Sequence, residues 1–600
     1  MKISFLLILT ICFAGISVTQ QHRKELWLTP AEKSNFHTTP RYDKTIYYLQ
    51  RMAKVSPWIH LTYIGKTPEG RPMPLVIVSK NSMEINPKRA QASGKAIVLV
   101  QSGIHAGEID GKDASLMLLR DICVTKEKEM LLEKIILLIL PIYNLDGHER
   151  FSPFNRINQN GPDSMGWRTT AQNLNLNRDY MKADAPETQM WLKLFNEWLP
   201  DFYVDCHVTD GADYQYPITY AINDQQNVAP SVRSWITDKL LPSVDKKMAI
   251  KNILLAPYIF WKNERDVTQG IVNESGPPRF STEYGVIQNR PAYLIETHML
   301  KNYKTRVEAT YHLLQSLFEE IYESAGALRL AVRTADEEII SAGEKGDGNF
   351  KVPLQMELTD VADTMMYLGY KYSVEESEVS KNSWMKFTNE PQNIRIPLFK
   401  TTKVQKEITL PYAYLIPQQW TSVLSVLKLH DIKLQRLTKP TRLQVESYKF
   451  SNAHWNERPF EGRHYVNFMS EKITEERMYP SGTIVVPMNQ RAAKVAVHLL
   501  EPDAPDALIH WGFLDALFEQ KEYGEDYVLE KLAREMMNKD ANLKNEFEQK
   551  IATDSIFAKS SFERLNFFYK KSPYWDARKD VYPIAKIVRR MSIPVEPLKK

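Results

Sequence analysis

The sequence predicts an α/β protein whose first half is a three-layer α/β/α domain built on a mostly parallel mixed sheet. Continuous apolar runs that are typical of buried strands occur at residues 96–100, 135–140, 202–206 and 292–295. Segments with apolar residues at helical spacing lie between these runs. Because strands that alternate with helices favour a parallel sheet covered on both faces, we expect a functional site beyond the carboxyl ends of the strands.

The first twenty residues predict an export signal and not a part of the fold. Lys2 is followed by an apolar core at residues 5–16, and charge returns at residues 22–24. Such a core is too short for a membrane span. No later segment is long and apolar enough to be a transmembrane segment. We therefore expect a soluble protein that is secreted or periplasmic after the signal is removed.

Composition favours a folded protein of two or three domains, since 600 residues exceed a single core. The net charge of +4 is small for this length and no Lys/Arg run is present, so we expect no nucleic-acid partner. Only Cys123 and Cys206 follow the signal, and two cysteines are no disulfide framework. We expect Cys206 to be a buried small residue.

The elements of the first half are predicted in a simple order. A short helix at residues 42–52 precedes a hairpin of strands at 59–64 and 72–79, which the turn Pro68-Glu69-Gly70 joins. After the hairpin we expect a strand at 96–100, a helix at 112–122, a strand at 135–140, a helix at 187–198, strands at 202–206 and 292–295, and an amphipathic helix at 302–321.

Histidine and carboxylate side chains follow three of the predicted strands. His105 and Glu108 lie in the turn after residues 96–100, His207 follows residues 202–206, and Glu296 follows residues 292–295. Alone, a His-x-x-Glu pair is more often a plain surface pair, but here three strand ends meet at one sheet edge. Two imidazoles and one carboxylate are a catalytic zinc set. We expect one zinc ion at His105, Glu108 and His207, with Glu296 as general base.

Further motifs within residues 40–325 resemble those of the zinc metallocarboxypeptidase (carboxypeptidase A-like) family. Thr67-Pro68-Glu69-Gly70-Arg71-Pro72 resembles the hairpin before the metal turn, and Asn144-Leu145-Asp146-Gly147 resembles an Asn-Pro-Asp-Gly motif with leucine in place of proline. Gly166-Trp167-Arg168 resembles the segment with the arginine that polarises the scissile carbonyl. Asn177-Arg178 resembles the pair that grips the terminal carboxylate of the substrate.

This resemblance implies a carboxypeptidase-like peptidase domain at residues 25–330 that hydrolyses C-terminal peptide bonds. Arg168, with Arg156 as the alternative, would face the developing oxyanion. Arg178 offers a planar fork that matches a carboxylate, and Asn177 adds a donor. The implied partner is a peptide or protein with a free C-terminus.

Three features depart from the family pattern. Asn175 stands where an aspartate commonly orients the first metal histidine, and its amide oxygen can accept a hydrogen bond but has no charge. Tyr284 is the nearest candidate for the family's substrate-binding tyrosine, although its spacing to Glu296 is short and the loop at 276–279 is unusual. Arg290 is either a further substrate contact or a plain loop charge.

Residues 335–600 predict a mixed α/β accessory region without a metal constellation. A turn-rich segment at 341–348 precedes the predicted elements, which are strands at 366–372, 395–398, 408–415, 447–450 and 483–486, a helix at 420–429 and a helical pattern at 492–550. Trp511-Gly512-Phe513 and residues 572–576 are similar to large secreted bacterial members of the family. We expect this region to shape or cap the cleft.

Other functions remain open at the level of the sequence. A cell-wall peptide amidase or carboxypeptidase is the alternative enzyme, and an inactive carboxypeptidase-like binding module is the alternative from another class. A scaffold in which the cluster only forms ion pairs would bind no metal. The chain has no His-Glu-x-x-His and no Gly-x-Ser-x-Gly motif, which disfavours those two hydrolase types.

Overall fold

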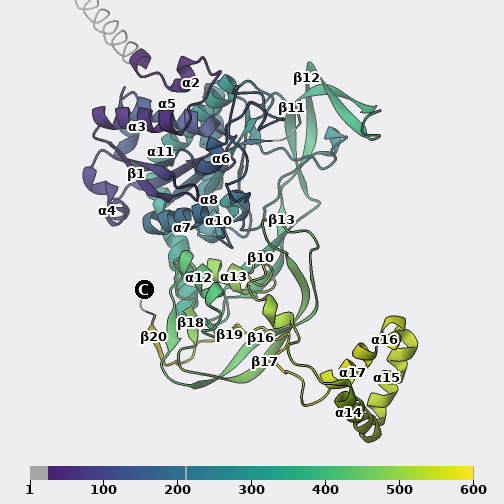
Figure 1. Ribbon diagram of the computed structural model, residues 1–600. Coiled ribbons are helices and arrows are strands. Elements are labelled where there is room, and N and C mark those ends of the chain that lie inside the picture. The colour runs from purple at the N-terminus through teal and green to yellow at the C-terminus, as the bar shows by residue number, and fades with distance from the viewer. Residues whose placement is uncertain (1–23, 210–211, 599–600) are drawn as a thin grey trace, which may run out of the picture.

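The computed structural model describes residues 24–209 and 212–598. The predicted export signal therefore lies outside the described residues. In Figure 1 most of the first half of the chain forms the upper body, with the hairpin at residues 362–399 beside it. Most of the second half forms the lower body, from which a helical arm projects. Within the described residues, none of the helices combines the length and the apolar character that a membrane span requires.

The upper body is built around an eight-stranded mixed sheet with the strand order β1-β2-β4-β3-β5-β9-β6-β7. The central strands β4, β3, β5 and β9 run parallel, whereas β1 and β2 on one side and β6 on the other join in antiparallel fashion. The strands are β1 (Ile59–Lys66), β2 (Pro72–Val78), β3 (Ala96–Ser102), β4 (Ile135–Leu140), β5 (Phe202–Thr209), β6 (Ile218–Ile222), β7 (Leu255–Pro257) and β9 (Ala292–His298).

Helices cover both faces of this sheet. Val98 and Val100 of β3 belong to one apolar cluster and Ile97 and Leu99 to another, because successive side chains of a strand point to opposite faces. The first cluster includes α3 (Tyr42–Val55), α5 (Asp110–Cys123), α8 (Pro230–Trp235), α9 (Leu241–Ile250) and α11 (Tyr303–Lys345). The second includes α4 (Pro87–Ala92), α7 (Pro186–Trp198) and α10 (Ser281–Ile287). The predicted three-layer arrangement is confirmed.

Short helical segments connect these elements. They are α2 (Pro30–Lys33), η1 (Ser82–Ile85), η2 (Glu129–Glu133), α6 (Leu145–Glu149), η3 (Leu176–Arg178), η4 (Ile236–Leu240) and η5 (Val267–Gln269). Each predicted strand and helix of the first half is present, but β5 and β9 run about three residues further than predicted. His207 and Glu296 therefore lie within their strands and not after them.

The lower body contains a seven-stranded sheet with the order β17-β16-β19-β14-β18-β15-β20, whose pairings are antiparallel. Its strands are β14 (Ala413–Ile416), β15 (Gln435–Leu437), β16 (Thr441–Trp455), β17 (Val466–Tyr479), β18 (Ile484–Pro487), β19 (Ala585–Ile587) and β20 (Val595–Pro597). Two smaller sheets combine β10 (Lys351–Leu358) with β13 (Thr402–Thr409), and β11 (Ala362–Glu376) with β12 (Ser383–Phe399) and β8 (Ile271–Val272).

The two bodies share one apolar core. The apolar cluster that contains side chains of α7 and α10 also contains side chains of α12 (Thr421–Leu429) and α13 (Ala493–Leu500) in the lower body. The remaining elements are η6 (Asp515–Phe518) and the arm of α14 (Asp526–Lys539), α15 (Ala541–Thr553), α16 (Ser555–Lys559) and α17 (Ser561–Lys570), which Figure 1 shows projecting from the lower body.

Three predictions for the second half were wrong in detail. The segment at 341–348 was predicted to be rich in turns, but its first five residues belong to α11, which continues to Lys345. Gly343 instead allows close packing, since a Cβ atom there would lie 2.1 Å from the carbonyl oxygen of Met488. Residues 408–415 are divided by Pro411 into β13 and β14. The helical pattern at 492–550 is interrupted after α13, where Pro502 and Pro505 follow the helix.

Cys123 and Cys206 are both buried and free, and the expected burial of Cys206 is confirmed. Burial raises the pKa of both thiols, so neither is an activated nucleophile.

Candidate metal centre

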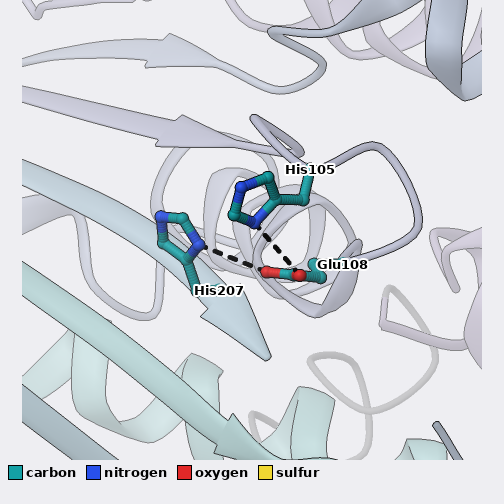
Figure 2. Close-up of side chains that lie close together, drawn as sticks. All are labelled: His105, Glu108 and His207. Atoms are coloured by element: carbon teal, nitrogen blue, oxygen red, sulfur yellow. Dashed lines mark hydrogen bonds and ion pairs between the residues drawn. The ribbon is translucent and has the colours of Figure 1, made fainter. Parts of the chain in front are cut away.

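Three side chains from two neighbouring strand ends converge in the upper body. His105 and Glu108 lie in the turn between β3 and α5, and His207 lies on β5, which pairs with β3. Figure 2 shows both imidazoles pointing toward the Glu108 carboxylate. Nδ1 of His105 is 3.1 Å and Nδ1 of His207 is 3.2 Å from oxygens of Glu108. The three ligand atoms lie within 4.8 Å of one another.

The other nitrogen of each imidazole is held by an oxygen. Nε2 of His105 lies 3.1 Å from Oδ1 of Asn175, and Nε2 of His207 lies 2.8 Å from Oδ2 of Asp205. Oδ1 of Asn175 also accepts the backbone N–H of Asn177, so it is the oxygen and not the nitrogen of the amide. Each Nε2 therefore donates its proton, and each Nδ1 is left to direct its lone pair toward the cluster.

The donor set fits a zinc ion. Burial lowers the pKa of His105 to about 4, so its imidazole is neutral. Burial opposes the ionisation of Glu108, but His105 and Arg156 nevertheless hold its pKa well below the ordinary value. Burial opposes the charging of His207 as well, while Asp205 raises its pKa well above the ordinary value. Two histidines and one carboxylate are a known catalytic zinc set, and each histidine has the oriented outer partner that metal ligands usually have.

The neighbouring strand places Glu296 beside the three side chains. Glu296 on β9 is the register partner of His207 on β5, and its side chain is mostly buried. Its charge also acts on His207, where it favours the protonated imidazole. The structure thus brings the predicted general base next to the predicted ligands.

Two arginines also reach the cluster. Arg156 lies 2.9 Å and Arg168 lies 3.2 Å from Oε1 of Glu108. The side chain of Arg156 is 8% exposed and that of Arg168 is 35% exposed, so Arg168 is the one that faces open space. Both sequence candidates for the oxyanion contact are therefore at the site.

Arg178 and Asn177 lie on the short helix η3, next to Asn175. The Arg178 guanidinium lies over the Phe280 ring at 4.1 Å and donates a hydrogen bond to the carbonyl oxygen of Asn177 at 2.7 Å. Among the described residues it forms no ion pair with a carboxylate. Burial and the charge of Arg168 lower the pKa of Arg178 to about 10. Oδ1 of Asn177 accepts the backbone N–H of Ser281. A desolvated guanidinium without an anion is suited to bind one.

The structure does not bring Tyr284 to the cluster. Its ring is fully buried among Trp191 and Phe195, and its hydroxyl contacts His430 at 2.8 Å and Gln288 at 2.7 Å. Tyr284 was predicted as the substrate-binding tyrosine because it is the candidate nearest to Glu296 in the sequence. In the structure it lies on the buried face of α10. A substrate contact would require both hydrogen bonds to break.

Other candidates from the sequence have structural partners. Arg290 forms a bidentate ion pair with Asp336 on α11, which identifies it as a structural charge. His148 contacts Glu149 and Lys112, and His298 contacts Asp213. The structure gives none of them a place among the three converging ligands.

Three functional partners escaped the sequence reasoning. Asp205 orients His207 and also accepts the hydroxyl of Ser281, whose backbone N–H in turn holds Asn177. Glu461 of the lower body accepts the backbone N–H of Asn175 at 2.8 Å. Asp205 could have been found from the sequence, because it is a charged residue inside the apolar run at 202–206 and a buried carboxylate needs a partner. The short-range pattern contains no such signal for Glu461.

Comparison with known proteins agrees with this site. The zinc carboxypeptidase family model matches residues 45–275. "Carboxypeptidase 2" of Trichophyton rubrum is 23% identical over 495 residues, which are 79% of this chain and 84% of that protein. Two solved structures are also similar. They are a metallo-carboxypeptidase from Burkholderia cenocepacia (17% identity, TM-score 0.35, 49% of this chain and 69% of that one) and the carboxypeptidase A from Helicoverpa armigera (20%, 0.35, 50% and 76%). The family match over residues 45–275 and the curated relatives show that this chain is similar to zinc carboxypeptidases, which are hydrolases of the metallopeptidase class.

Proposed function

We propose that this protein is an exported metallocarboxypeptidase that holds one zinc ion at His105, Glu108 and His207 and releases C-terminal residues from peptides. The observation that supports it most is the convergence of both Nδ1 atoms on the Glu108 carboxylate, with each Nε2 tied to an oxygen. This arrangement directs two Nδ1 atoms and one carboxylate toward a position where they can bind a divalent cation.

The chain's own residues have distinct tasks in this reaction. Zinc in such a site polarises a carbonyl group and lowers the pKa of a water molecule. The Glu296 carboxylate accepts the proton of the attacking water and delivers it to the leaving amine. Arg168, or Arg156 beside it, stabilises the negative charge that develops on the carbonyl oxygen.

The position of the cut follows from Arg178. Its half-buried guanidinium binds the C-terminal carboxylate of a peptide through two parallel hydrogen bonds, and Asn177 adds a donor. Because this anchor lies on the same turn as Asn175, which contacts His105, the last peptide bond is the one presented to the cluster. Tyr284 has no role in this proposal.

Export and the division of the chain belong to the same proposal. The apolar core at residues 5–16 supports removal of about the first twenty residues. Residues 25–330 form the peptidase domain and residues 335–600 the accessory region, although helix α11 crosses the expected boundary and continues into the accessory region.

A panel of peptides with the same sequence and either free, amidated or D-configured C-termini tests the proposal. We expect mass spectrometry to show stepwise loss of single C-terminal residues from the free peptides and strong protection by amidation, because amidation removes the charge that Arg178 binds. Internal cuts, or equal cleavage of free and amidated peptides, would refute the exopeptidase assignment. Preference for the D-configured end would favour a peptidase that acts on cell-wall peptides.

A further inference from the structure

A loop of the accessory region reaches the candidate site. It connects β16 and β17, and its tip is the tight turn from Phe460 to Arg463, where the backbone groups of these two residues pair with each other. Glu461 and Gly462 occupy the central positions with φ angles of +51° and +78°. Glycine, asparagine and aspartate are the usual residues in such a turn, so a glutamate there adopts a disfavoured conformation.

Contacts with both halves of the chain hold this turn in place. Arg463 forms two hydrogen bonds with the Asp184 carboxylate, at 2.6 and 2.7 Å. The Phe460 ring stacks on Trp511 with centroids 6.0 Å apart. Gly462 lies against Leu174, since a Cβ atom there would approach its side chain to 3.5 Å. The disfavoured conformation of Glu461 is therefore maintained by its surroundings.

The Glu461 carboxylate contacts the turn that contains the predicted substrate-binding pair. Its Oε2 accepts the backbone N–H of Asn175 at 2.8 Å. The Asn175 side chain in turn contacts His105 and accepts the N–H of Asn177. One carboxylate from outside residues 45–275 is thus connected, through a single residue, to a candidate zinc ligand and to the candidate carboxylate anchor.

We propose that Glu461 is a positioning residue through which the accessory region completes the active site. Asn175 caps a helix of only three residues, and so short a segment cannot fix its own orientation. The hydrogen bond from the Asn175 backbone N–H to Oε2 of Glu461 anchors this turn to a second segment, so Glu461 fixes Asn175 in the orientation that His105 and Asn177 require. The part of this proposal that concerns substrate rests on the proposed function of Arg178.

The charge of Glu461 has a second effect on the same turn. It partly offsets the effects of Arg168 and Arg279, which together with burial lower the pKa of Arg178. The resulting pKa of about 10 leaves the guanidinium charged at neutral pH. The hydrogen bond to Asn175 remains the contact on which positioning depends.

Three substitutions at this position test the proposal in the full-length protein. Glu461→Ala removes the acceptor, Glu461→Asp keeps the charge but shortens the reach, and Glu461→Gln keeps an oxygen at the same distance without the charge. Glu457→Ala is the matched control, because Glu457 is an exposed carboxylate of the same loop. Zinc affinity in competition with a chelator, KM and kcat for a free-ended peptide, and Tm are measured for each variant.

We expect Glu461→Ala to weaken zinc binding and to raise KM, each by about 10-fold, which is the lower end for loss of a hydrogen bond to a charged group. Glu461→Asp should show a smaller loss of the same kind, and it replaces the alanine variant in the test if that variant does not fold. Glu461→Gln and Glu457→Ala should remain within about 3-fold of the unaltered protein.

Unchanged zinc affinity and KM in folded Glu461→Ala, with or without a lower Tm, would overturn the positioning role. An equal loss in Glu461→Gln would also overturn it, because charge and not the hydrogen bond would then be responsible. If the unaltered protein cleaves no free-ended peptide, the proposed function fails, while the zinc affinities still decide whether Glu461 positions His105.

Discussion

Replacement of Glu296 by glutamine is expected to lower turnover by at least about 100-fold, the usual contribution of a general base. Glutamine has nearly the same shape but cannot take a proton from water. Since Glu296 is a register partner of His207 and not one of the three converging ligands, zinc content should remain about one ion per chain. The base and the metal are therefore separable.

This prediction requires kinetics and elemental analysis on the same preparation. Glu283→Gln is the matched control, because Glu283 is a buried carboxylate that contacts Asn223 and lies outside the cluster. Burial raises the pKa of Glu283 to about 7, so a neutral amide should replace it with little effect on turnover. Near-normal hydrolysis by Glu296→Gln would remove Glu296 from the mechanism.

Replacement of Arg178 by alanine is expected to cost about 2–5 kcal/mol in transition-state stabilisation, or about 30- to 5,000-fold in kcat/KM. The loss combines the desolvated charge pair with the positioning of the terminal bond. Zinc binding should be unaffected, because Arg178 does not contact the three ligands.

Amidated substrate provides the internal control for this variant. If Arg178 binds the terminal carboxylate, amidation should strongly impair the unaltered protein but add little to the defect of Arg178→Ala, since both changes remove the same contact. Independent, additive effects of the substitution and of amidation would show that another group anchors the substrate.

The strands that carry the site could be predicted from local sequence patterns, because buried parallel strands are short apolar runs with distinct ends. The runs at 96–100 and 202–206 and the three ligands could be derived in this way, and Asn175 lies beside His105 as the family resemblance implied. Strand length was less well predicted, because polar residues such as His207 continue a strand where the site satisfies them.

Contacts between distant segments could not be derived from the sequence. Tyr284 was selected by its spacing to Glu296, yet its position on the inner face of α10 directs it to the core. Glu461 lies 286 residues from Asn175 in the chain, and its role depends on how the accessory region packs. A similar limit applies to α11, whose length is determined by the core that it crosses and not by local turn residues.

The zinc content of the purified protein tests the central claim most directly. Elemental analysis should give about one zinc ion per chain for the unaltered protein and almost none for a folded His105→Ala/His207→Ala variant, because two of the three ligands are then missing. Stoichiometric zinc that persists in the double variant, or an unaltered protein that is folded but does not bind zinc on titration, would contradict the assignment of His105, Glu108 and His207 as the metal site.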